Sequence, residues 1–282
     1  MPATFPSHAA AVLPLKLWRP AWFDGVALVI GSAAPDLPYA LGRSERPPYT
    51  YGHTWWGVLA SVPVTVAATH LVRRAAPEVA AHLPGLGPFA AGDYGTLGGV
   101  RHPWWVTAGS ALVGAASHVA WDHVTHASVR GTAVGVARLE REVLPGVPAW
   151  MPLHLASSAA GAAGWLALSA RLGRRRKLVA WHGPAPAVRR RPVVFWGTAA
   201  ATAVAGAAVA GLAPTPQERI VPFLPPLPRP SVLSGRLLGI AATSLIAAAA
   251  VHRAVSGRRI AAAPAVSSGA LRRAGGGPRT PR

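Results

Sequence analysis

Residues 171–212 read RLGRRRKLVAWHGPAPAVRRRPVVFWGTAAATAVAGAAVAGL, in which eight basic residues precede twenty residues, 193–212, without a charged side chain. About 20 apolar residues are enough to cross the hydrocarbon core of a bilayer. Clusters of Arg and Lys are typical of the loops on the cytoplasmic side of a membrane protein. The stretch therefore predicts a basic cytoplasmic loop followed by a membrane-spanning helix.

The composition of the whole chain agrees with this interpretation. Its 282 residues include 28 Lys+Arg and 9 Asp+Glu, a net charge of +19, yet only 13% of residues are charged and 51% are hydrophobic. Soluble domains have about 25% charged residues, and disordered chains combine their charge with low hydrophobicity. The composition argues against both classes, and against a nucleic-acid-binding protein. Because cysteine is absent, disulfides, thiolate metal sites and cysteine nucleophiles are excluded.

Six stretches are candidates for spans, at residues 22–41, 55–72, 104–121, 153–170, 193–212 and 232–251. Pro35 and Asp36 interrupt the first, so we expect it to be broken or re-entrant. Tryptophans stand at several span ends, as interfacial anchors do. The predicted fold class is all-α, a polytopic transmembrane helical bundle of about six spans.

The basic residues are unevenly divided between the two sets of connections. The richer set contains Lys16, Arg19, Arg73, Arg74, Arg101, the basic residues of 171–191, Arg253, Arg258 and Arg259. The poorer set contains Arg43, Arg46, Arg130, Arg138, Arg141, Arg219 and Arg229. This bias predicts a multi-pass plasma-membrane protein with both termini in the cytoplasm. The partners that we expect for the basic loops are the bilayer and its anionic lipids, not nucleic acid.

The same patterns divide the chain into four parts. Residues 1–172 are expected to form a membrane bundle, 173–192 a basic cytoplasmic loop and 193–252 a C-terminal transmembrane hairpin. Residues 253–282 end in Ala, Gly, Ser, Pro and Arg without a period, which predicts a disordered basic tail.

Ionisable residues near the outer ends of the spans are the candidates for chemistry, because they are costly there. His118, Asp122 and His126 are spaced by four and therefore share one stripe of a helix, whereas His123 points away from it. Imidazole and carboxylate without sulfur suit Zn²⁺, Mn²⁺ or Fe²⁺. The alternative is a polar helix end that faces water.

Two further donors should reach the same side of the bundle. Asp36 follows Pro35, and His53 stands just before the second span, so a hairpin of the first two spans brings both toward Asp122. Five such donors at one membrane face predict a site for a divalent metal, with Zn²⁺ the first choice.

Two other histidines are further candidates for this site. His154 begins the fourth span and is expected to act, like His126, as a ligand or a proton-transfer group. His8 joins the site only if a short helix over residues 7–17 folds back into the bundle or if residues 22–41 do not form a span. Lys16 and Arg19 favour the cytoplasmic side for that helix.

Several of these pieces also resemble a known family. They are residues 4–15 (TFPSHAAAVLPL), 31–36, 51–57, the motif His118-x-x-x-Asp122-x-x-Thr125-His126 and the motif His154-x-x-Ser157-Ser158. They are similar to an uncharacterised bacterial family of multi-spanning membrane proteins, a domain of unknown function common in actinobacteria. The resemblance covers roughly the first 170 residues.

A more distant resemblance is to zinc-dependent phospholipase C and to predicted membrane-bound metal-dependent hydrolases. It implies metal roles for Asp36, His53, His118 and Asp122, with His8, His126 and His154 as further members. That pattern has a Glu one turn after a late histidine ligand, and here Ser157 and Ser158 follow His154 instead.

These observations predict a metal-dependent hydrolase of a phosphoester or lipid-like substrate. A metal or proton transporter that uses the same residues is one alternative, and a scaffold with a structural His/Asp cluster is another. A transporter should carry acidic or histidine residues deep within several spans, and spans 193–212 and 232–251 contain none.

Overall fold

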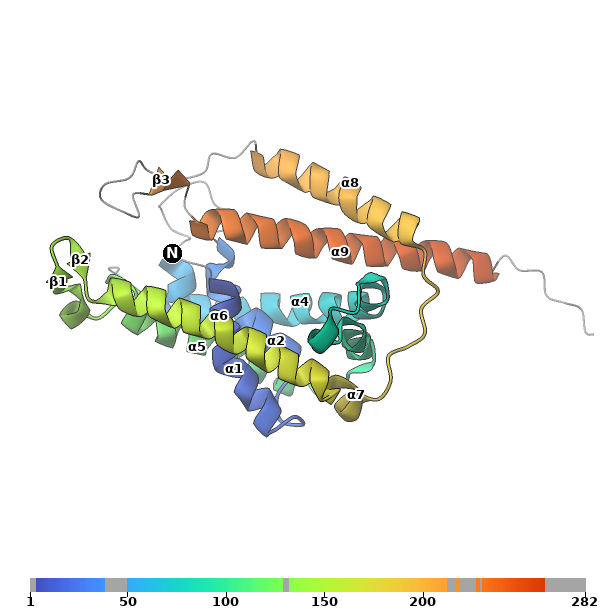
Figure 1. Cartoon of the computed structure of the whole chain (residues 1–282), viewed down its shortest axis with the longest axis horizontal. Helices are drawn as coiled ribbons and strands as arrows, with labels where there is room; N and C mark the ends of the chain where they lie inside the picture. Colours follow the sequence, from blue (N-terminus) through green and yellow to red (C-terminus); the bar gives the residue numbers. More distant parts are fainter. Residues whose placement is uncertain are drawn as a thin grey trace, which may run out of the picture.

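The computed structural model describes residues 4–38, 50–128, 132–211, 217–218, 227–228 and 230–261, and most of these residues are helical. The α-helices are α1 (Thr4–Trp18), α2 (Gly25–Gly31), α4 (Trp55–His82), α5 (Trp104–Thr125), α6 (Trp150–Arg174), α7 (Lys177–His182), α8 (Pro192–Gly211) and α9 (Pro230–Ala261) (Figure 1). Short 3₁₀ helices are η1 (Ala34–Asp36), η2 (Thr50–His53), η3 (Gly87–Phe89), η4 (Ala91–Gly99) and η5 (Ala137–Glu140). Two small antiparallel pairs join β1 (Glu142–Leu144) to β2 (Val147–Pro148) and β3 (Gln217–Glu218) to β4 (Leu227–Pro228).

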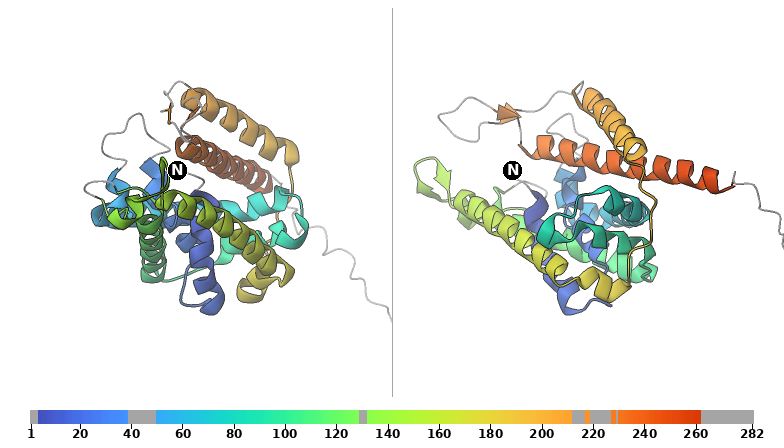
Figure 2. Two further views of the ribbon diagram at one scale, coloured as in Figure 1. Left: turned by 60° about the vertical axis from the view of Figure 1, so that its left-hand side comes forward. Right: turned by 45° about the vertical axis from the view of Figure 1, so that its right-hand side comes forward.

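The helices form two groups. Helices α1, α2, α4, α5 and α6 pack into a bundle, and α8 and α9 form an antiparallel hairpin along one side of it, where α9 contacts α4 (Figures 1 and 2). Phe195 is fully buried at this contact among Ala75, Ala199 and Ala248. The guanidinium of Arg253 pairs with the Glu78 carboxylate at 2.8 Å and fixes α9 to α4.

Glycines allow α2 and α5 to pack with their backbones in contact. A Cβ atom at Gly31 would lie 2.5 Å from the Ala111 carbonyl oxygen, and one at Gly114 would lie 2.5 Å from the Leu28 carbonyl oxygen. Small residues at such positions are typical of closely packed membrane helices. This contact fixes the position of the chain that follows α2 relative to the C-terminal half of α5.

The first expected span is interrupted where Pro35 and Asp36 predicted. Helix α2 ends at Gly31 after seven residues, and η1, with Pro35 in its first turn, follows a short turn. A seven-residue helix is too short to cross a bilayer.

Three helical segments within the described part of the chain are long and apolar enough to cross a membrane: Trp55–His82, Pro192–Gly211 and Val232–Ser256. They are consistent with membrane insertion, but the expected number of about six spans is not confirmed. Helices α5 and α6 are long enough, with 22 and 25 residues, but neither contains an 18-residue stretch as apolar as those of the three candidates. In α5 the polar side chains of Thr107, Ser110 and His118 are buried inside the bundle.

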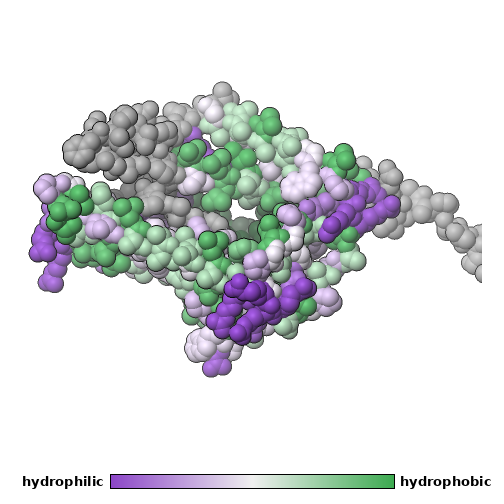
Figure 3. All heavy atoms as spheres, in the orientation of Figure 1, coloured by the Kyte–Doolittle hydropathy of each residue, from purple (hydrophilic) through white to green (hydrophobic). Residues whose placement is uncertain are grey.

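The surface is apolar over wide areas. Large hydrophobic side chains are exposed on α4 and α8, among them Trp55, Trp56 and Val204. Figure 3 shows apolar residues along the helices and hydrophilic residues gathered near the C-terminal end of α6 and α7, where Arg171 and Arg174 are exposed. An apolar surface of this kind is typical of a face that contacts lipid or another protein.

Two cations that we assigned to loops lie inside the bundle. Helix α4 continues to His82, ten residues beyond the expected end of the second span, so Arg73 is in its interior. Arg73 is buried and pairs with Asp24 at 2.6 Å. The buried Lys16 ammonium donates to the carbonyl oxygens of Pro20 and Phe23 at 2.7 and 2.8 Å. These two cations therefore make contacts inside the bundle and are not loop charges that report topology.

The C-terminal region differs in one respect from the expected division. Helix α9 continues to Ala261, so residues 253–261, expected in the tail, are the last turns of this helix. The remaining tail, 262–282, lies outside the described residues, as does most of the Pro-rich connector between α8 and α9.

Candidate metal centre

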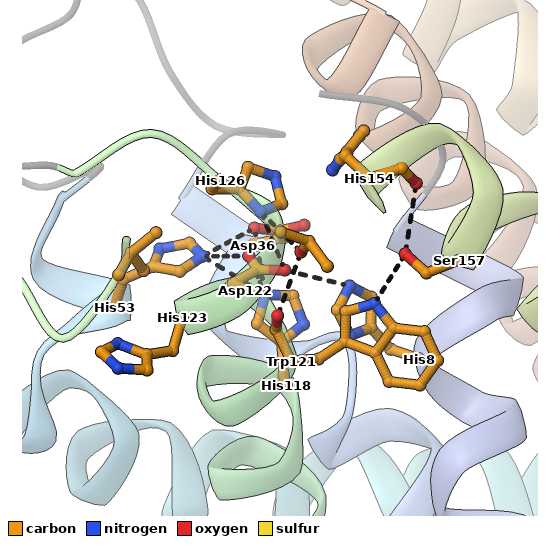
Figure 4. Close-up of polar contacts among 12 residues, drawn as sticks. His8, Asp36, His53, His118, Trp121, Asp122, His123, His126, His154 and Ser157 are labelled. Carbon is orange, nitrogen blue, oxygen red and sulfur yellow. Dashed lines mark hydrogen bonds and ion pairs between the residues drawn. The ribbon is translucent and has the colours of Figure 1, made fainter. Parts of the chain in front are cut away.

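Four side chains from separate segments meet at one end of the bundle. Asp36 comes from the end of η1, His53 from the end of η2, and His118 and Asp122 from one face of α5 (Figure 4). One donor atom of each lies within 4.8 Å of those of the other three. His53, His118 and Asp122 are buried, and the Asp36 side chain is 13% exposed.

The separations of these donor atoms are short. The His53 Nε2 atom lies 3.2 Å from Asp122 Oδ2 and 3.3 Å from Asp36 Oδ1. The His118 Nε2 atom lies 3.2 Å from Asp122 Oδ2 and 3.5 Å from Asp36 Oδ1. The two Nε2 atoms are 3.2 Å apart. Ligand atoms bonded at about 2.1 Å around a tetrahedral Zn²⁺ lie about 3.4 Å from one another, so the four-residue group fits a divalent ion.

A backbone carbonyl fixes the orientation of His118. Its Nδ1 atom lies 2.8 Å from the carbonyl oxygen of Ser32, in the turn after α2. Because a carbonyl oxygen only accepts hydrogen bonds, Nδ1 carries a proton, and Nε2 is the ring atom that faces the other three candidate ligands. Metal-bound histidines are commonly held by this kind of hydrogen bond.

Close backbone contacts position the other two segments. A Cβ atom at Gly52 would lie 2.1 Å from the Pro35 carbonyl oxygen, so a glycine before His53 lets this segment approach Asp36. Thr54 then caps α4 by accepting a hydrogen bond from Gly57 N at 3.0 Å. These contacts explain how a loop histidine lies beside a carboxylate from a different turn.

Replacing Gly52 with alanine is expected to weaken metal binding at least about tenfold, because the new methyl group forces His53 away from Asp36. Titration of purified protein with Zn²⁺ after chelator treatment measures the effect. Gly109→Ala in α5 is the control, since a Cβ there meets nothing within 4 Å. Equal affinities of the two variants would contradict this role for Gly52.

Three further histidines surround the four-residue group. His8 Nε2 lies 3.4 Å and His126 Nδ1 lies 3.3 Å from Asp122 Oδ1, on the side of the carboxylate away from His53. The His126 ring meets the His154 ring edge-on with 4.4 Å between centroids. His123 is exposed, and its Nδ1 atom lies 2.8 Å from the Ala133 carbonyl oxygen, so it points away from the centre (Figure 4).

His126 and His8 differ in detail from the sequence predictions. Helix α5 ends at Thr125, so His126 is its C-cap residue in extended conformation and not a third residue of one helical stripe. His8 reaches the centre because α1 packs against α6 inside the bundle. The start of α1 therefore lies at the same end of the bundle as the candidate metal centre.

Burial and neighbouring charges shift the pKa values of the ionisable groups at this centre. Burial disfavours protonation of His53, but hydrogen bonds with Asp122 and Asp36 outweigh it and raise the pKa of His53 to about 9. Burial also opposes ionisation of Asp122, yet His118 and the other histidines hold its pKa below its ordinary value. Burial lowers the pKa of His8 to about 3. A cation that binds through His53 needs the neutral form of this imidazole.

Over residues 1–256 the sequence matches the family described as Domain of unknown function (DUF4184). The chain belongs to this family. No curated protein and no solved structure is significantly similar to it. The family match extends through α8 and most of α9, beyond the first 170 residues that carry the motif resemblance, so the C-terminal hairpin is part of the family's domain.

Some contacts of the centre had no signal in the sequence. The Ser32 carbonyl that holds His118 is a backbone group 86 residues away in the chain. Trp121 Nε1 donates to Ser157 Oγ at 3.3 Å and joins α5 to α6 beside the centre. Ser157, three residues after His154, serves here as a hydrogen-bond acceptor between helices.

Proposed function

We propose that this chain is a polytopic membrane protein with a divalent-metal centre that hydrolyses a phosphoester of a lipid-like substrate. The observation that carries the proposal is the convergence of Asp36, His53, His118 and Asp122, with donor atoms at the mutual distances of a metal ligand set. A set of two imidazoles and two carboxylates suits Zn²⁺.

The residues around the centre can divide the chemistry among them. A bound divalent ion lowers the pKa of water and stabilises negative charge on a phosphoryl oxygen. Asp36, His53, His118 and Asp122 hold the ion. His126 lies next to Asp122, His154 lies against the His126 ring, and both serve as proton-transfer groups. Within the described part of the chain the buried Nε2 atom of His154 has no hydrogen-bond partner.

The surroundings support a lipid-like substrate. Trp55 and Trp56 are exposed and follow His53 almost directly. Tryptophans of this kind lie at the headgroup level of a bilayer. The metal centre then lies at the level where the phosphoester of a lipid headgroup is found.

The length of α6 supports a transmembrane position of the bundle. His154 in its second turn and Arg174 at its end are 20 residues apart, about 30 Å along the helix, which matches a hydrocarbon core. We place the basic end, with the start of α7, on the cytoplasmic side of the plasma membrane, against anionic lipid headgroups. Arg253, paired with Glu78 near the end of α4, puts the C-terminal end of α9 on that side too. A cytoplasmic N-terminus does not follow, because His8 puts the start of α1 at the metal end.

Metal analysis of the detergent-purified full chain tests the proposal. We expect about one divalent ion per chain, and a loss of thermal stability when a chelator removes it, because a ligand that binds only the folded state stabilises it. Restoration of the melting temperature by Zn²⁺ but not by Mg²⁺ supports a nitrogen-containing ligand set. A protein that contains no metal, and whose melting temperature neither chelator nor Zn²⁺ changes, would overturn the proposal.

One observation favours a structural alternative. His53 lies within 3.3 Å of carboxylate oxygens of both Asp36 and Asp122, so a protonated His53 can pair with them without a metal. Under this alternative His53→Gln lowers the melting temperature in chelator as much as in Zn²⁺. Under the metal proposal most of the loss appears only in the presence of Zn²⁺.

A further inference from the structure

A second site lies at the other end of the bundle. A cavity of about 300 Å³ is lined by residues of α1, α2, the middle of α4, η4, the end of α6 and α7. Its lining shares no residue with the metal centre and includes the apolar side chains Leu13, Val29, Ile30, Leu97, Trp165 and Leu172. The volume is at the lower end of the range for small-molecule sites, which are mostly apolar with a few polar groups.

Two buried cations line this otherwise apolar cavity. Lys16 and Arg73 are each only 6% exposed, and Asp24 is the buried acidic residue beside them. Two positive charges against one negative leave an excess of one positive charge, and burial of unbalanced charge is costly. An anionic ligand group would balance it.

Both cations also retain hydrogen-bond donors. The Lys16 ammonium has three N–H groups, and two of them go to the carbonyl oxygens of Pro20 and Phe23. Arg73 binds Asp24 through one terminal nitrogen, while its buried Nε atom has no partner within the described part of the chain. These donors suit an anion with at least two acceptor oxygens.

The position of the cavity agrees with such a ligand. Trp181 of α7 lies with its ring centroid 5.5 Å from Lys16 Nζ and forms part of the lining. The exposed arginines at the end of α6 are nearby in the chain, so the surrounding field attracts anions. An amphiphile can enter with its chain against Leu13 and Ile30 and its head at the cations.

We propose that this cavity binds a single-chain fatty carboxylate, with the carboxylate at Lys16 and Arg73 and the chain along the apolar wall. The cavity is too small for a lipid with two chains, and one excess positive charge matches one carboxylate. The site is distinct from the metal centre, because none of its lining residues belongs to that centre.

Equilibrium binding of labelled dodecanoate to the full chain, in micelles of an uncharged detergent, tests the proposal. We expect saturable binding of about one dodecanoate per chain, with dodecanol and dodecyltrimethylammonium at least tenfold weaker. Lys16→Met keeps the side-chain length and is expected to weaken dodecanoate binding about tenfold or more. Leu97→Trp, which fills the cavity and leaves the cations in place, should abolish saturable binding.

Two controls separate this site from other effects. Lys177→Met removes the same charge at the start of α7, outside the lining, and should bind dodecanoate as the parent does. His118→Ala disables the metal centre and should also leave binding unchanged, so failure here and failure of the hydrolase proposal are distinguishable. Binding that does not saturate, that is equal for dodecanol, or that survives in the Leu97→Trp variant overturns the proposal.

Discussion

Replacing Asp122 with alanine is expected to remove the bound divalent ion and to lower hydrolysis of a lipid-like phosphoester at least about 100-fold. Asp122 is close to four histidines of the centre. Its Oδ2 atom lies 3.2 Å from both His53 and His118, and its Oδ1 atom lies 3.3–3.4 Å from His126 and His8. Mutation of a residue that only hydrogen-bonds to a metal ligand typically lowers metal affinity or activity 10–100-fold. Loss of a ligand itself is therefore expected to have a larger effect.

Metal content per chain and the rate of phosphoester hydrolysis measure this effect. Asp122→Asn has nearly the same shape but no charge, so it separates loss of the ligand from loss of packing, and we expect it to lose the metal too. His123→Ala changes the adjacent residue, which is exposed and points away from the centre, and should keep both metal and activity. If Asp122→Ala retains a full equivalent of metal, Asp122 is not a ligand.

Local patterns in the sequence predicted much of this centre. The spacing of His118 and Asp122 places both on one helix face, and Pro35 predicted the break that presents Asp36. Their convergence with His53 needed only the assumption that neighbouring helices form a hairpin. Such inferences succeed because helix periodicity and proline geometry are local properties of the chain.

The parts that the sequence did not predict depend on contacts between distant segments. Arg73 looked like a loop residue because it follows an apolar run, yet α4 continues past it and a carboxylate 49 residues earlier neutralises it. His8 could not be placed because the packing of α1 on α6 is decided by small residues, such as Gly161, where a Cβ would lie 2.6 Å from the Ser7 side chain. No local period reports such pairings.

The Asp24–Arg73 pair leads to the largest expected change in stability. Replacing Asp24 with alanine is expected to lower the free energy of unfolding by about 4 kcal/mol, since it leaves a buried arginine without its counter-ion. The Asp24 carboxylate also accepts hydrogen bonds from Thr107 Oγ1 at 2.8 Å and from the first backbone N–H groups of α2. Loss of that helix cap contributes about 1 kcal/mol of the total. The melting temperature in detergent should fall by roughly 10 °C.

Two comparisons, with Asp93→Ala and with a double variant, identify the cause of this loss of stability. Asp93→Ala removes a carboxylate 2.7 Å from Arg176, whose side chain is 65% exposed and remains hydrated, so it should cost less than about 1 kcal/mol. Replacing Asp24 and Arg73 together with leucine should be less destabilising than Asp24→Ala alone, because one buried cation, Lys16 with its two carbonyl acceptors, then remains without a counter-ion instead of two. If Asp24→Ala is as mild as Asp93→Ala, water reaches Arg73. The cavity beside it would then be hydrated and unsuited to an acyl chain, so this melting experiment also bears on the fatty carboxylate site.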